Sequence, residues 1–166
     1  GLGYPGGPAL ARLAACGRDD AFELPRPLLH KPNLDFSFAG LKTAVAVRVA
    51  RLPAPLEDTQ RADMAASVQT AIVDVLCAKS MRALRNTGLK RLVVAGGVGA
   101  NTALRERLGR ECARNGARVH YPELALCTDN GAMIALAAAL RWQHGVATPS
   151  VAGSFDVRPR WDLAQA

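Results

Sequence analysis

Residues 92–101 constrain this chain most, because they read LVVAGGVGAN. The apolar start predicts a buried strand, the glycines predict a tight turn, and Asn101 is a residue type that caps helix N-termini. Glycine allows a backbone to approach a ligand closely and to adopt positive φ angles. The free N–H groups of a helix N-terminus attract anions. The segment therefore predicts either a seat for an anionic, nucleotide-like group or a tight turn that binds nothing.

Helical and strand patterns alternate around this segment, which predicts the α/β class. Helical periodicity covers residues 6–17, 41–52, 58–87, 101–115 and 131–144, and strand patterns cover 34–38, 91–95 and 117–121. The longest helix is predicted to be capped by Asp58 and to stop at Gly88. In the helix that begins at residue 101, one stripe is expected to be buried: Leu104, Leu108 and Cys112. In the last helix, four residues are expected to be buried: Met133, Ile134, Leu136 and Leu140.

Length and composition are typical of one ordinary globular region. The chain has 166 residues, of which 49% are hydrophobic and 21% charged, so residues 1–166 are expected to form a single α/β region with a sizeable core. It contains no run of 18 apolar residues and no secretory signal, which predicts a cytoplasmic protein without a membrane span. Because it does not begin with Met, the chain is expected to start inside a longer protein.

The charged and sulfur-containing residues indicate partners only in general terms. The net charge of +7 favours polyanions such as RNA, although the excess is almost all Arg and is spread over several predicted helices. The four cysteines form no CxxC pair, so reduced thiols are expected rather than a zinc or redox motif.

A second candidate segment, CTDNG at residues 127–131, precedes the last predicted helix. Thr128 or Asp129 suits a helix N-cap, and a capped turn without a ligand is one interpretation. In the other, Asp129 points toward the glycine turn, where its carboxylate binds a metal or orients a hydroxyl. The histidines lack metal-ligand spacing, and no P-loop or nucleophile motif occurs, so no catalytic residue is assigned.

Five segments occur in a specific order: YPGGP at 4–8, DFSFAGLKT at 35–43, VAGGVGAN at 94–101, CTDNGAMIA at 127–135 and VRPRW at 157–161. Together they closely resemble the carboxyl-terminal half of the TsaD family of tRNA adenosine threonylcarbamoyltransferases, formerly called glycoproteases. The resemblance implies an actin/Hsp70/sugar-kinase-like (ASKHA) fold of two lobes. This chain would be the carboxyl-terminal lobe or a fragment of it, without the amino-terminal lobe.

The resemblance also implies an activity, the transfer of a threonylcarbamoyl group from threonylcarbamoyl-AMP to the exocyclic amine of the adenosine 3′ of the tRNA anticodon. Substrate contacts would come from Gly7, Gly96, Gly97 and Asn101. Asp129 would be one ligand of a divalent metal, iron or zinc, whose other ligands are histidines of the absent amino-terminal half. The chain alone is therefore expected to be inactive.

The implied partners are tRNA, a paralogous ASKHA-fold subunit and a small P-loop ATPase. Two alternatives remain open at this point. One is a non-catalytic ASKHA-fold partner or scaffold subunit, against which Asn101 and Asp129 argue, because a scaffold needs no ligand carboxylate. The other is a metallopeptidase, for which the sequence shows no peptidase constellation.

Overall fold

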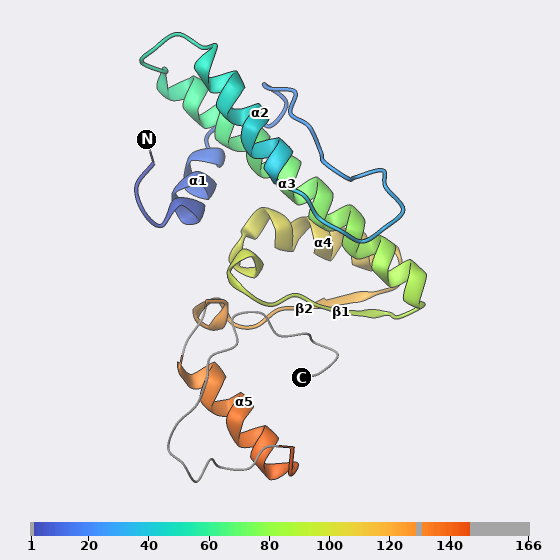
Figure 1. Cartoon of the computed structure of the whole chain (residues 1–166). Coiled ribbons are helices and arrows are strands. Elements are labelled where there is room, and N and C mark those ends of the chain that lie inside the picture. The colour runs from blue at the N-terminus through green and yellow to red at the C-terminus, as the bar shows by residue number, and fades with distance from the viewer. Residues whose placement is uncertain (1, 129–130, 147–166) are drawn as a thin grey trace. The chain divides into compact units, whose positions relative to one another are not determined.

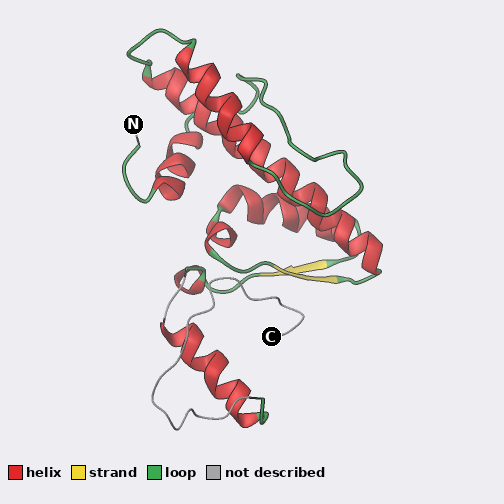
Figure 2. Ribbon diagram, in the orientation of Figure 1, coloured by secondary structure: helices red, strands yellow, loops and turns green. Residues whose placement is uncertain are grey.

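The computed structural model describes residues 2–128 and 131–146. The chain divides into two compact units, Gly1–Thr128 and Asp129–Ala166. The first unit contains α1 (Gly6–Ala14), α2 (Ala39–Ala50), α3 (Asp58–Thr87), β1 (Arg91–Val93), α4 (Thr102–Arg114) and β2 (Arg118–His120), with short 3-10 turns at Gly97–Ala100 and Leu124–Leu126 (Figures 1 and 2). The described part of the second unit contains α5 (Gly131–Gln143).

The helix α3 has 30 residues and is the element on which the first unit is built. Glu57 and Gln60 form a reciprocal capping box at its start, in which the Glu57 N–H donates to Gln60 Oε1 at 3.2 Å. Gly88 ends the helix with a φ of +70°, as the sequence predicted. The bounds of the predicted helix are confirmed, but the cap on Asp58 is wrong by one residue. Asp58 already belongs to the helix, and Glu57 is the N-cap.

The other helices of the unit pack against different parts of α3 (Figure 1). α1 packs on Ala65 and Ala66 through Ala14, and α2 packs near Met64 through Leu41. α4 packs on the carboxyl-terminal half of α3 through its buried stripe of Leu104, Leu108 and Cys112. That stripe is confirmed, since a helix with apolar residues at this spacing covers one face of a core.

The two strands form a parallel sheet in which Arg91 pairs with Arg118 and Val93 with His120. Leu92 and its neighbour Val119 pack against the core formed by α3 and α4. Side chains on the opposite face are exposed within the described residues, and Val93 is 73% exposed. The prediction of a buried strand over 91–95 is therefore corrected. The strand is shorter, and the two helices of that core cover one face of the sheet.

Residues 34–38 were predicted to form a half-buried strand and have no regular secondary structure. Within the described residues, β1 and β2 pair only with each other, so this segment has no strand partner. The alternation in its sequence instead places Phe36 and Phe38 together, with stacked rings whose centroids lie 6.3 Å apart.

The helix α5 confirms the predicted helix near residues 131–144 but not its burial. Four residues were expected in a core, Met133, Ile134, Leu136 and Leu140, and their exposed fractions lie between 43% and 64%. An apolar pattern predicts which residues favour burial, but burial also requires a surface that covers them. None of the helices within residues 2–128 and 131–146 has both the length and the hydropathy needed to span a membrane.

Two glycine substitutions test how closely α3 is packed. A Cβ at Gly17 would overlap the backbone carbonyl of Ala62 on α3, whereas a Cβ at Gly109 on α4 would enter open space. We expect Gly17→Ala to lower the free energy of unfolding by about 2 kcal/mol through overpacking. Gly109→Ala should raise it by about 0.5 to 1 kcal/mol, because alanine favours the helix. Urea unfolding of both variants checks this, and a Gly17→Ala protein as stable as the parent would contradict the packing.

Candidate functional site

The glycine turn, defined here as residues 96–101, follows β1 and leads into α4. Gly96 has a φ of +86° with open space around its Cβ position, so the backbone conformation, not crowding, requires glycine there. The Gly99 N–H donates to the Gly96 carbonyl at 2.9 Å and closes the turn. Gly96 and Gly97 are exposed, and in the described part of the chain their N–H groups donate to no protein acceptor. These two amides are therefore available to an external acceptor.

The side chain of Asn101 connects the glycine turn to two helices. Its Oδ1 accepts a hydrogen bond from the Leu104 N–H at 2.9 Å, which confirms the predicted N-cap of α4. Its Nδ2 donates to Gln69 Oε1 on α3 at 2.9 Å. A primary amide carries two N–H donors, so one donor of Asn101 remains for another partner.

The side chain of Arg105 joins the glycine turn to the residues that follow β2. Its Nε donates to the Gly99 carbonyl at 2.6 Å, and one terminal nitrogen contacts the Pro122 carbonyl at 3.0 Å and Cys127 Sγ at 3.3 Å. The guanidinium also lies 4.5 Å from the ring centre of Tyr121. We call these contacts the Arg105 bridge. It holds together the segments that leave the carboxyl ends of both strands, which is where α/β sheets bind ligands.

Sequence reasoning missed Arg105, although a signal was present. A cation in the second turn of a helix lies near the positive end of the helix dipole, where it is unfavourable unless other groups compensate it. Here two carbonyls, a thiol and an aromatic ring provide that compensation.

Asp129, the predicted metal ligand, lies outside the described residues, so its proximity to the glycine turn stays a prediction. The structure places the residues just before it. Cys127 is buried and belongs to the Arg105 bridge, and Thr128 follows it directly. The Arg105 guanidinium bonds to both Cys127 and Gly99, so the residue just before position 128 is linked to the glycine turn.

Tyr121 lies under the Arg105 guanidinium, with its hydroxyl group shielded from solvent and without a partner among the described residues. Burial raises the pKa of the Tyr121 hydroxyl, while the positive charge of Arg105 opposes that shift. The hydroxyl therefore stays protonated at neutral pH.

Gly7 lies on the first turn of α1, is exposed, and has open space at its Cβ position. No hydrogen bond among the described residues joins it to the glycine turn. The two segments nevertheless approach the same face of α3, because α1 packs on Ala65 and Asn101 bonds to Gln69, which is four residues further along that helix.

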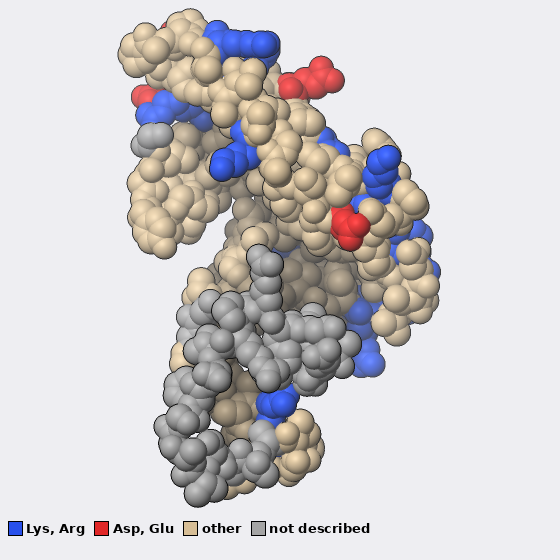
Figure 3. Space-filling model, in the orientation of Figure 1, with Lys and Arg blue, Asp and Glu red and all other residues tan. Residues whose placement is uncertain are grey.

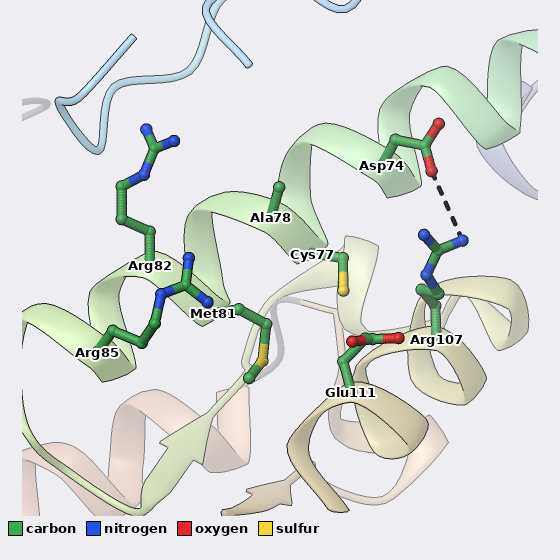
Figure 4. A pocket seen from close by; sticks show the side chains of 8 residues that line it. All are labelled: Asp74, Cys77, Ala78, Met81, Arg82, Arg85, Arg107 and Glu111. Atoms are coloured by element: carbon green, nitrogen blue, oxygen red, sulfur yellow. Dashed lines mark ion pairs between the residues drawn. The ribbon is translucent and has the colours of Figure 1, made fainter. Parts of the chain in front are cut away.

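A cavity of about 280 Å³ lies elsewhere, between α3 and α4 (Figure 4). Figure 4 shows Cys77 directed from α3 toward Arg107 and Glu111 of α4, and Met81 also lines the cavity. Burial raises the pKa of the Cys77 thiol, which keeps it protonated. Across residues 2–128 and 131–146, no three His, Cys, Asp or Glu side chains gather in a way that would hold a metal.

A parallel sheet, a glycine turn with free amides and an Asn-capped helix place the chain in the α/β class, in which such turns at the carboxyl ends of strands can bind anionic groups. The family model described as TsaD, tRNA N6-adenosine threonylcarbamoyltransferase, matches residues 1–136, and the chain belongs to this family.

Proteins named tRNA N6-adenosine threonylcarbamoyltransferase are similar to the chain. The one from Variovorax paradoxus is 65% identical over 164 residues and the one from Methylibium petroleiphilum 64% identical over 164 residues. The alignments cover 99% of this chain but 46% and 47% of those proteins. The chain therefore spans about half the length of the curated relatives it matches.

The Arg105 bridge predicts that lysine cannot replace Arg105. A single ammonium group keeps the charge but cannot reach Gly99, Pro122 and Cys127 together, so Arg105→Lys should lower the free energy of unfolding by about 2 kcal/mol. Arg110→Lys is the control and should cost less than about 0.5 kcal/mol, because Arg110 is exposed and its one ion pair within the described residues is with Glu106 at 4.0 Å. Equal urea unfolding midpoints for the two variants would contradict the bridge.

Proposed function

We propose that this chain forms the carboxyl-terminal part of an enzyme that transfers a threonylcarbamoyl group from threonylcarbamoyl-AMP to tRNA. The acceptor is the exocyclic amine of the adenosine 3′ of the anticodon. Membership of the TsaD family and the names of relatives at 64% and 65% identity support this proposal. The observation that carries it within the structure is the glycine turn, whose two free amides and Asn-capped helix suit a phosphate-bearing ligand.

In this proposal the residues of the chain bind and orient the adenylate. The N–H groups of Gly96 and Gly97 donate to it, and Asn101 offers the amide hydrogen that Gln69 leaves free. Gly7 takes part from α1, which approaches the same face of α3. Fixed donors need no rearrangement when charge develops on the phosphate, and so they favour its departure.

The chemistry of the transfer is an acyl substitution. The amine nitrogen forms a bond to the carbamoyl carbon, the bond from that carbon to the phosphate oxygen breaks, and AMP leaves with the electron pair. The amine loses one proton in the process. No described side chain is assigned as the base that accepts it, and the role of this chain is positional and electrostatic.

The described residues by themselves do not form a metal site. We propose Asp129 as one ligand of a divalent metal, iron or zinc, with the remaining ligands outside this chain. A single carboxylate does not hold such an ion tightly, because metal sites of this kind use three or four protein ligands. The ion, when bound, would balance the negative charge of the phosphate, while Gly96, Gly97 and Asn101 bind and orient the adenylate.

The wider assembly is part of the same proposal. Residues 1–166 would form one α/β region of a two-lobe ASKHA fold in a cytoplasmic enzyme. Its partners would be tRNA, a paralogous ASKHA-fold subunit and a small P-loop ATPase. The small parallel sheet with helices packed on it is consistent with that fold, and the net charge of +7 suits an RNA substrate.

Substitutions of Asn101 separate its capping role from its proposed contact with the adenylate. Asn101→Asp keeps a capping oxygen, and the Gln69 amide can turn to donate to the new carboxylate, so stability should change by less than about 1 kcal/mol. The carboxylate repels a phosphate, and we expect KM for threonylcarbamoyl-AMP in the full-length protein to rise at least about tenfold. Asn101→Ala should also raise KM and, because it removes the cap, should lower the free energy of unfolding by about 1 kcal/mol. An unchanged KM in Asn101→Asp would remove Asn101 from the binding site.

Asp129→Ala tests the proposed metal ligand. In the full-length protein we expect loss of tightly bound divalent metal and of threonylcarbamoyl transfer, with the free energy of unfolding changed by less than about 1 kcal/mol. Asp20→Ala, which replaces an exposed carboxylate on a loop, serves as the control and should keep both properties. Metal content by elemental analysis and transfer to unmodified tRNA are the measurements. Metal content and transfer that persist without Asp129 would remove Asp129 from the metal site.

A further inference from the structure

The positive charge of this chain is concentrated in one part of the sequence. Residues 75–120 hold ten of the 21 Lys and Arg residues but only two of the 14 Asp and Glu residues. The remainder of the chain is therefore close to neutral. The segment comprises the second half of α3, the strands and α4, and Figure 3 shows Lys and Arg side chains gathered where α3 ends.

Several of these cations are already neutralised by neighbours. On α4, Arg107 lies 3.6 Å from Asp74, Arg110 lies 4.0 Å from Glu106, and Arg114 lies 2.9 Å from Glu111. Four others are exposed and form no ion pair within the described residues: Arg85, Lys90, Arg91 and Arg118. We call these four residues the basic end.

The residues of the basic end are neighbours in the structure. Arg91 and Arg118 lie directly opposite each other in the sheet. Arg85 and Lys90 line one hollow of about 70 Å³, and Arg85 also lines the cavity of Figure 4. Like charges placed opposite each other in a sheet destabilise it. A fold that keeps such a pair without a carboxylate beside it retains an electrostatic cost that an anionic partner would remove.

We propose that the basic end binds the phosphate backbone of an RNA. Three of its four cations are arginines, whose planar guanidinium donates two parallel hydrogen bonds to a phosphate. The choice of RNA among polyanions rests on the function proposed above. Arg91 and Arg118 begin the strands, whereas the glycine turn follows β1 at the opposite edge of the sheet. The contact therefore lies at the other end of the strands from the glycine turn, and we expect it to set RNA affinity without changing the chemical step.

The test compares two quadruple variants of the full-length protein that change net charge equally. The basic-end variant carries Arg85→Gln, Lys90→Gln, Arg91→Gln and Arg118→Gln. The control variant replaces four ion-paired arginines, Arg18, Arg61, Arg110 and Arg114, by Gln. The probe is an unmodified tRNA transcript, whose Kd is measured across a series of salt concentrations.

Four phosphate contacts correspond to a slope of about −3 in log affinity against log salt, or a loss of about 60-fold for a fourfold rise in salt. We expect the basic-end variant to lose this part of the salt dependence and to bind tRNA at least about tenfold more weakly at low salt, while the control keeps both. The thermal midpoint of the basic-end variant should stay the same or rise, because the repulsion between Arg91 and Arg118 is removed. Equal losses in both variants, or unchanged binding by the basic-end variant, would overturn the proposal.

Two further measurements separate this inference from others. If the basic-end variant keeps its affinity for tRNA but no longer binds vesicles of anionic phospholipid, the surface binds membranes and the RNA proposal is wrong. If the quadruple variant does not fold, Arg85→Gln and Lys90→Gln repeat the comparison one at a time. Failure of threonylcarbamoyl transfer in the parent protein, with the salt dependence intact, would refute the proposed function and leave the basic end in place. Normal transfer by the parent protein, with a salt slope in the basic-end variant equal to that of the parent, would support the proposed function and refute RNA binding at the basic end.

Discussion

The packing of three helices against α3 is the constraint on which the rest of the first unit depends. α3 buries thirteen residues along its length, and four of them, all in its amino-terminal half, are alanines that allow a neighbouring backbone to approach closely. Gly17 next to Ala62 is the clearest example of this approach. Next to these alanines the neighbouring chain is positioned by contact with the backbone of α3, whereas α2 and α4 pack on its larger side chains. Close packing of either kind tolerates little displacement.

The candidate site inherits this rigidity. Asn101 is bonded to Gln69 on α3, and Arg105 bonds to Gly99, so the second half of the glycine turn is held at two points. A backbone held in this way presents its amides in a fixed direction before any ligand arrives. Fixed donors are worth more to binding and catalysis than mobile ones, because no free energy is spent on ordering them. In the proposed site, the main-chain amides donate hydrogen bonds to the ligand, and the side chains of Asn101 and Arg105 hold the main chain in place.

Much of this fold could be predicted from the sequence, because the signals were local. The bounds of α3 follow from its periodicity and from Gly88, and the cap on α4 follows from Asn101. The errors concern features set by distant residues. The segment 34–38 alternates like a strand, but Lys79 and Arg82 on α3 bond to carbonyls of the residues just before it, including Asn33. The buried ammonium of Lys79 needs these acceptors, because its burial lowers its pKa and disfavours the charged form.

The candidate site was only partly predictable, because it too combines local signals with contacts to distant residues. The glycines and Asn101 carry their signal in the local sequence, whereas Arg105 acts through residues up to 22 positions away. Its partners are two carbonyls, a thiol and a ring, none of which is recognisable as a partner from sequence spacing. The two ends of the strands are proposed to bind anions in different ways. Beyond β1, main-chain amides hold an anion through geometry. At the start of both strands, unpaired side-chain cations attract one through charge, and salt should weaken the second far more than the first.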